Sequence, residues 1–186
     1  MRHRLFAAIR PPAPVIDALL ALEGGSEGYI RGARWQDESQ LHLTLRFFGE
    51  VEAPQAEDIA DVLAQVHAAP FALALRGVGH FEKKGRQGSR THTLWAGVAP
   101  SQPLAALQRR VENAARRAGL PPEQRKYSPH ITLARLNSAS GAVLPFLAAH
   151  GALTGEPWPV EAFDLIESTL TPAGSEYETV RRYRLA

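Results

Sequence analysis

Apolar and polar side chains alternate along the stretch LHLTLR at residues 41–46. A period of two is typical of a β-strand, so the leucines should share one face and His42, Thr44 and Arg46 the other. The stretch HITL at residues 130–133 repeats this alternation. Further strands are predicted at residues 4–9, 71–81 and 93–99, and as a C-terminal hairpin within 160–186.

Apolar residues at helical spacing predict helices between these strands. Ser101 can cap the clearest one and Gly119 can end it. The predicted helices span residues 13–25, 53–69, 101–119 and, more briefly, 140–151. Because several strands follow one another without a helix between them, we expect an α+β fold with antiparallel pairs. A strand, a helix and an HxTL strand occur in that order twice, which favours two related lobes within one domain, 1–186.

The composition excludes several kinds of site. The chain has no cysteine, so disulfides, thiolate metal sites and cysteine nucleophiles are ruled out. A formal net charge of +2 suits a phosphate-bearing ligand better than the coating of nucleic acid, which needs a strong basic stripe. The N-terminal apolar run is too short for a signal peptide, and no apolar stretch approaches a membrane span. We therefore expect a cytoplasmic protein with no membrane partner, and a monomer.

The two HxTL tetrads are the strongest chemical signal. Each places a histidine and a threonine on the polar face of a strand: His42 and Thr44 in the first, His130 and Thr132 in the second. If the two polar faces line one cleft, a neutral imidazole can take a proton while a protonated one donates to a leaving oxygen. The threonine hydroxyls can hold phosphoryl oxygens in the transition state. The pattern therefore indicates phosphodiester chemistry without a metal.

Two simpler interpretations compete with this one. The tetrads could be ordinary buried strands, since threonine fits any strand and a histidine there is more often structural. Two histidines could also ligate zinc, but a zinc site usually needs a third protein ligand. His80 and His92 flank an irregular loop, and only the fold could recruit them. The sequence predicts no metal and no cofactor.

Longer blocks around the tetrads resemble a known family. RLFAAIRPP, RWQDESQLHLTLRFFGEV, TLWAGV, RKYSPHITLAR and STLTPAGSEYETV occur in the order found in the 2H phosphoesterase superfamily, and most closely resemble bacterial RNA 2′,3′-cyclic phosphodiesterases, the 2′-5′ RNA ligase family. The resemblance runs nearly end to end. It implies a bilobal α+β fold, with two pseudo-symmetric lobes of antiparallel strands and flanking helices around a central cleft.

The resemblance also implies an activity. It is metal-independent hydrolysis of RNA 2′,3′-cyclic phosphate ends, or of cyclic nucleotides, to 2′-phosphates. It makes His42 and His130 catalytic, with His130 as the base for water and His42 as the acid for the departing 3′ oxygen. Thr44 and Thr132 would bind the phosphate. Two alternatives stay open: 2′-5′ ligation of RNA halves, or an RNA-end binding module without turnover.

Four further residues are candidates for substrate binding. Arg135 follows the second tetrad, but strict alternation places it on the leucine side, so the strand must end or twist before it reaches the cleft. Arg46 shares the face of His42 and could meet phosphate. Tyr127 and Phe48 could stack a base, since aromatic faces accept bases with little sequence preference. For Arg135 and Arg46 the alternative is a solvated arginine, and for Phe48 it is packing in the core.

Overall fold

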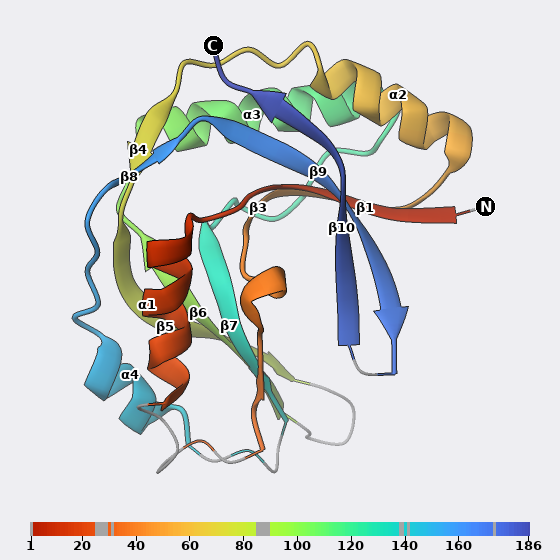
Figure 1. The fold of residues 1–186 in the computed structure, drawn as a ribbon. Helices are drawn as coiled ribbons and strands as arrows, with labels where there is room; N and C mark the ends of the chain where they lie inside the picture. Colours follow the sequence, from red (N-terminus) through yellow and green to blue (C-terminus); the bar gives the residue numbers. More distant parts are fainter. Residues whose placement is uncertain are drawn as a thin grey trace.

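The structure is a computed structural model that describes residues 2–24, 30, 32–84, 90–137, 140, 142–172 and 174–186. Its centre is a sheet in the order β10-β9-β1-β3-β7-β6-β5, with β2 also paired to β7 (Figure 1). Among the described residues, all of its strand pairs are antiparallel. The strands of this sheet are β1 (Arg2–Ile9), β2 (Arg34–Trp35), β3 (Leu43–Glu52), β5 (Leu75–Lys84), β6 (Arg90–Val98), β7 (His130–Leu136), β9 (Ala162–Thr171) and β10 (Gly174–Arg184).

In the described part of the chain, four helices and a small second sheet accompany it. The helices are α1 (Ala13–Gly24), α2 (Ala53–Leu63), α3 (Gln102–Arg117) and α4 (Leu144–His150), with a 3-10 turn η1 (Glu38–Gln40). The two-stranded sheet pairs β4 (Phe71–Leu73) with β8 (Trp158–Val160). The expected α+β fold and C-terminal hairpin are therefore confirmed, whereas the β4–β8 pair was not predicted. Among the described residues, no helix is both long enough and apolar enough to cross a membrane.

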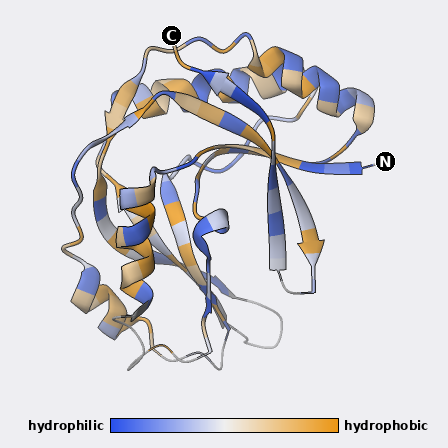
Figure 2. Ribbon diagram, in the orientation of Figure 1, coloured by the Kyte–Doolittle hydropathy of each residue, from blue (hydrophilic) through white to orange (hydrophobic). Residues whose placement is uncertain are grey.

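One large core lies between the helices and one face of the sheet. Leu19 of α1, Ile59 of α2 and Leu107 of α3 are almost fully buried in it, together with alternate strand residues such as Leu43 and Ile131. Figure 2 shows hydrophobic and hydrophilic residues interleaved along helices and strands, as expected when each element buries one side. On the opposite face, the described residues form a small apolar cluster of Phe6, Ala8 and Ile166, against which Tyr177 packs.

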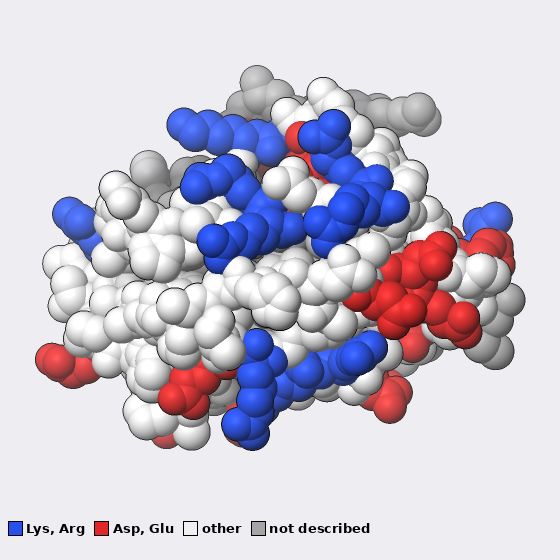
Figure 3. Space-filling model, turned by 90° about the horizontal axis from the view of Figure 1, so that it is seen from above, with Lys and Arg blue, Asp and Glu red and all other residues white. Residues whose placement is uncertain are grey.

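The basic residues of α3 hold the helical layer together. Figure 3 shows Lys and Arg side chains gathered on the face that α2 and α3 form, beside an acidic group. Arg110 donates to the His67 carbonyl, and Arg117 donates to the Val62 carbonyl at 3.4 Å. Part of this basic surface therefore fastens α3 to the end of α2 and to the residues that follow it.

Candidate active site at the junction of β3 and β7

The two tetrads meet where the two halves of the sheet join. Leu43 of β3 pairs with Ile131 of β7, and this is the only β3–β7 pairing among the described residues. Both side chains are buried in the core, with 1% and 0% of their surfaces exposed. Because the side chains of a strand alternate, the flanking histidines and threonines lie on the opposite face, where all four are half-buried: His42, Thr44, His130 and Thr132.

The antiparallel pairing gives the site an approximate twofold arrangement. His42 precedes Leu43 and Thr132 follows Ile131, so the first histidine lies toward the second threonine. By the same geometry, His130 lies toward Thr44. The structure thus brings the four residues together in one sheet, where each half-site supplies one imidazole and one hydroxyl.

Each histidine is fixed by the same main-chain contact. Nδ1 of His42 lies 2.6 Å from the Gln40 carbonyl oxygen, and Nδ1 of His130 lies 2.7 Å from that of Ser128. A carbonyl can only accept, so Nδ1 donates its proton in both rings. In the neutral tautomer that results, Nε2 keeps its lone pair. Both Nε2 atoms can therefore take up a proton without breaking the contact that orients the ring.

Aromatic side chains pack around both imidazoles. The rings of Phe6 and Tyr177 lie 4.8 and 5.2 Å from that of His42. The rings of Phe81 and Trp95 lie 4.9 and 6.3 Å from that of His130. A Cβ on Gly79 would lie 2.3 Å from the Trp95 ring, so only glycine leaves room for this tryptophan to lie against the strand.

Burial in these surroundings lowers the pKa of both histidines. The pKa of His42 falls from 6.5 to about 4, chiefly through desolvation, and the nearby charges of Arg10, His130 and Arg135 lower it further. The pKa of His130 is also lowered, again mainly by burial and then by Arg135. The contacts with the Gln40 and Ser128 carbonyls act in the opposite direction. At a pKa of about 4 the His42 imidazole is neutral at pH 7, and the lowered pKa of His130 favours its neutral form.

Arg135 reaches the site face because β7 contains a bulge. Thr132 pairs with Trp95, but Ala134 pairs with Leu94, so Leu133 is an extra residue in β7. The insertion shifts the alternation by one position, which returns the exposed Arg135 to the face of His130 and Thr132. Its positive charge lowers the pKa of both histidines. Strict alternation would have placed Arg135 on the leucine side of the strand, and the bulge explains why it lies on the side of the histidines instead.

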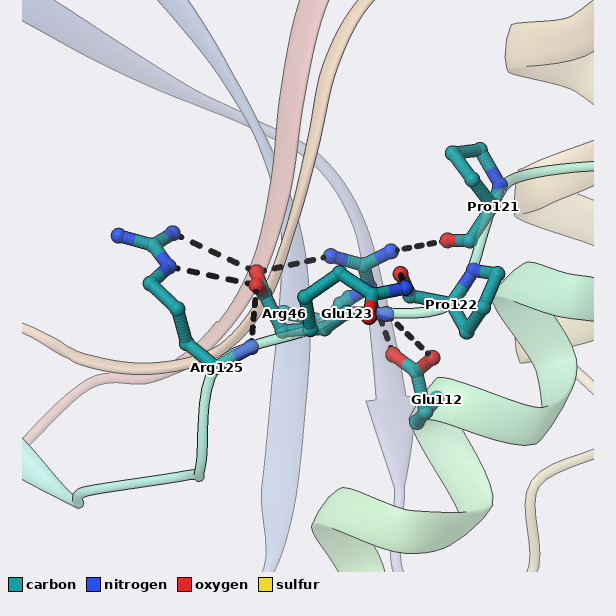
Figure 4. A network of polar contacts seen from close by, with 7 residues as sticks. Arg46, Glu112, Pro121, Pro122, Glu123 and Arg125 are labelled. Atoms are coloured by element: carbon teal, nitrogen blue, oxygen red, sulfur yellow. Dashed lines mark hydrogen bonds and ion pairs between the residues drawn. The ribbon is translucent and has the colours of Figure 1, made fainter.

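A bulge in β3 has the opposite effect on Arg46. Ala8 pairs with Thr44 but Ala7 pairs with Arg46, so Leu45 is the extra residue and Arg46 turns to the helical side of the sheet. Only 9% of Arg46 is exposed, and it forms ion pairs with Glu112 at 2.7 Å and Glu123 at 3.2 Å (Figure 4). It also donates to the Pro121 carbonyl at 2.7 Å. The prediction that Arg46 meets phosphate is wrong.

The bulge at Leu45 also places Phe48 in the core, because Phe48 lies two positions after Arg46 and shares its face. A second bulge follows at Phe48 itself, since Phe6 pairs with Phe47 and Leu5 pairs with Gly49. Phe48 is 7% exposed within the main core, so the prediction that it stacks a base is wrong. Phe47 is 39% exposed and stacks on Phe6 at 5.1 Å, which makes it the aromatic residue of this pair on the site side.

Tyr127 supports β3 beside the site. Its hydroxyl donates to the Thr44 carbonyl at 3.1 Å, and its ring packs against the main core. Burial raises the pKa of this hydroxyl, so it stays protonated and keeps donating. These contacts assign Tyr127 a structural task, and its stacking on a base stays a prediction.

The sequence patterns did not indicate Arg10 or the aromatic neighbours of the histidines. Phe6 lies within an apolar run that reads only as a buried strand. Phe81, Trp95 and Tyr177 come from β5, β6 and β10, and the chain order gives no sign that they meet the tetrads. The available signal was that Phe81, Trp95 and Tyr177 are aromatic residues within predicted strands.

Acid should destabilise the folded protein through His42. Its folded pKa of about 4 lies below the value of 6.5 expected in the unfolded chain, so the unfolded chain binds more protons between these values. Stability from this group is complete above pH 6.5 and is lost as the pH falls toward 4, by about 3 kcal/mol at pH 4. Urea unfolding of wild type and His42→Gln from pH 7 to pH 4 measures it. The wild type should lose about 3 kcal/mol more than the variant, and parallel curves would show that His42 is not desolvated.

Comparisons with known proteins place these features in a wider set. Residues 28–171 match the family model described as the 2'-5' RNA ligase superfamily. A Thermus thermophilus protein named RNA 2',3'-cyclic phosphodiesterase is 33% identical over 98% of this chain and 90% of its own length. An Aeropyrum pernix protein of the same name is 31% identical over 81% of this chain and 85% of its own. The crystal structure of Escherichia coli LigT complexed with 3'-AMP superposes with a TM-score of 0.79 at 25% identity, covering 100% of this chain and 99% of that one.

Proposed function

The chain belongs to the 2'-5' RNA ligase superfamily, and we propose that it is an RNA 2′,3′-cyclic phosphodiesterase. The names of the Thermus thermophilus and Aeropyrum pernix relatives support this activity. The single observation that carries it is the pair of histidines on one sheet face, each with Nδ1 held by a main-chain carbonyl and Nε2 left for proton transfer.

The proposed reaction needs one proton acceptor and one proton donor. Nε2 of His130 takes a proton from water, whose oxygen bonds to the phosphorus. The bond between phosphorus and the 3′ oxygen breaks, and Nε2 of protonated His42 gives this oxygen a proton. The products are a 2′-phosphate and a 3′-hydroxyl. One proton has moved onto His130 and one has left His42, so exchange with solvent restores both residues.

Substrate binding supplies the protonated imidazole that the free protein lacks. At a pKa of about 4, His42 is almost always neutral near pH 7. The negative charge of a bound phosphate favours the imidazolium, so the pKa of His42 rises in the complex. The Thr44 and Thr132 hydroxyls and the Arg135 guanidinium bind the non-bridging oxygens, whose charge the transition state must hold.

Two other functions use the same surface. In 2′-5′ ligation, the 5′-hydroxyl of a second RNA would take the place of water with the same two imidazoles. A binding module without turnover would hold the cyclic phosphate alone, and it has no need for two oriented Nε2 atoms. The paired carbonyl contacts of His42 and His130 therefore favour an enzyme.

The test is turnover of 2′,3′-cyclic AMP and of an RNA with a 2′,3′-cyclic phosphate end, with excess EDTA present. We expect turnover with 2′-phosphate as the product, identified by chromatography against 2′- and 3′-phosphate standards. Addition of a 5′-hydroxyl RNA measures ligation in the same sample. Binding of the RNA end without turnover would support the module instead, and a 3′-phosphate product would contradict the proposed direction of cleavage.

A further inference from the structure

Three side chains on β5 and β6 form a cluster with the donor atoms of a metal site. His80 and Glu82 are two positions apart on β5, so they share one face of the strand. His92 of β6 pairs with Glu82 in the antiparallel register and therefore projects to the same side. We propose that His80, Glu82 and His92 bind a divalent transition metal ion of the Zn²⁺ type.

The geometry of the cluster is close to that of a bound state. One potential ligand atom from each residue lies within 4.8 Å of the others. Around a tetrahedral Zn²⁺, with ligands at 2.0–2.2 Å, neighbouring ligand atoms are about 3.4 Å apart. The imidazole rings of His80 and His92 are already adjacent, with centroids 5.3 Å apart. Small side-chain rotations are therefore enough to close the three donors around one ion.

The donor set and its surroundings suit Zn²⁺. Two imidazoles and one carboxylate match its preference for nitrogen and oxygen ligands, and three protein ligands leave a fourth position for water. His92 Nδ1 is buried and has no hydrogen-bond partner among the described residues. A buried polar atom of this kind is costly unless it is satisfied, and a metal ion bound at Nδ1 would satisfy it. The exposed Glu82 gives the ion access from solvent.

The proposed metal site would lie on the face of the sheet opposite to His130 and its aromatic neighbours. Phe81 stands between His80 and Glu82 in the chain, so it projects to the opposite face, where its ring lies 4.9 Å from that of His130. An ion bound by residues of both strands would stabilise the pairing of β5 with β6 on the face opposite to this aromatic contact. Its role would be structural, and it would take no part in proton transfer at His130.

The experiment is a calorimetric titration of the metal-free protein with Zn²⁺. We expect one equivalent to bind, and His80→Ala or Glu82→Gln to weaken binding at least about 100-fold, because loss of a ligand costs more than loss of a residue that merely supports one. Glu82→Gln changes an exposed side chain at constant size, so it tests the site even if His80→Ala misfolds. Co²⁺ in place of Zn²⁺ should give visible absorption typical of nitrogen ligation.

Two controls separate this cluster from other histidines. His67→Ala removes an exposed imidazole outside the cluster and should leave Zn²⁺ binding unchanged. A variant with both His42→Asn and His130→Asn should also bind one equivalent, which distinguishes the cluster from the tetrad pair. Loss of Zn²⁺ binding in that variant, equal affinity in His80→Ala and wild type, or no binding at all would overturn the proposal.

Discussion

Replacing His42 or His130 with asparagine is expected to lower kcat for 2′,3′-cyclic nucleotides by about 10²- to 10⁴-fold, the usual contribution of a general acid or base. The asparagine amide can still donate to the Gln40 or Ser128 carbonyl that now accepts from Nδ1. What disappears is Nε2, the atom assigned to proton transfer. The substitution therefore separates the chemistry of the ring from its hydrogen bond to the main chain.

The two histidines should behave as a unit. Because both protons move in the same reaction, the double variant should be about as slow as the slower single variant, not slower by the product of the two effects. Steady-state kinetics on the four proteins measures this, and His67→Ala supplies a control for the loss of an imidazole elsewhere. Near wild-type turnover in either asparagine variant would remove that histidine from the reaction.

The parts of the site that sequence predicted are those that depend on short alternation. His42 with Thr44, and His130 with Thr132, lie on one face because no extra residue stands between the histidine and the threonine of either tetrad. Each bulge comes directly after the threonine, at Leu45 and at Leu133, so it leaves the pairing of histidine and threonine intact. Pairing the two tetrads needed the resemblance to a family, because alternation within one strand does not say which strand lies beside it.

The wrong predictions concern Arg46 and Phe48, which follow the first tetrad in β3. Arg46 and Phe48 were placed by extending a period of two through β3, but the bulge at Leu45 shifts the alternation by one position and moves both side chains to the core side. A bulge depends on how the neighbouring strand and the helices beneath it pack, and this information is not local to β3. The adjacent aromatic residues Phe47 and Phe48 were the visible sign, since strict alternation rarely places two large apolar side chains together.

Arg46 leads to the second large expected effect, which concerns stability. The Arg46 side chain is 9% exposed, and its guanidinium lies between Glu112 of α3 and Glu123 of the connector before β7 (Figure 4). Arg46→Met keeps the length of the side chain but leaves the two carboxylates without their buried partner. Removing one member of a buried ion pair costs about 3 kcal/mol or more, so urea unfolding at pH 7 should show a loss of this size.

Arg125 provides a matched control on the same carboxylate. It also pairs with Glu123 and is the main reason that the pKa of Glu123 falls to about 2, but its side chain is 85% exposed. Solvent screens such a contact, so Arg125→Met should cost less than about 1 kcal/mol. A second substitution, Glu112→Gln, should restore part of the stability of Arg46→Met, because it removes the unpaired buried charge.

If Arg46 bound phosphate instead, Arg46→Met would raise KM for the cyclic nucleotide while leaving the unfolding free energy nearly unchanged. We expect the reverse, because the bulge at Leu45 turns this arginine away from the histidines and into the layer between the sheet and α3.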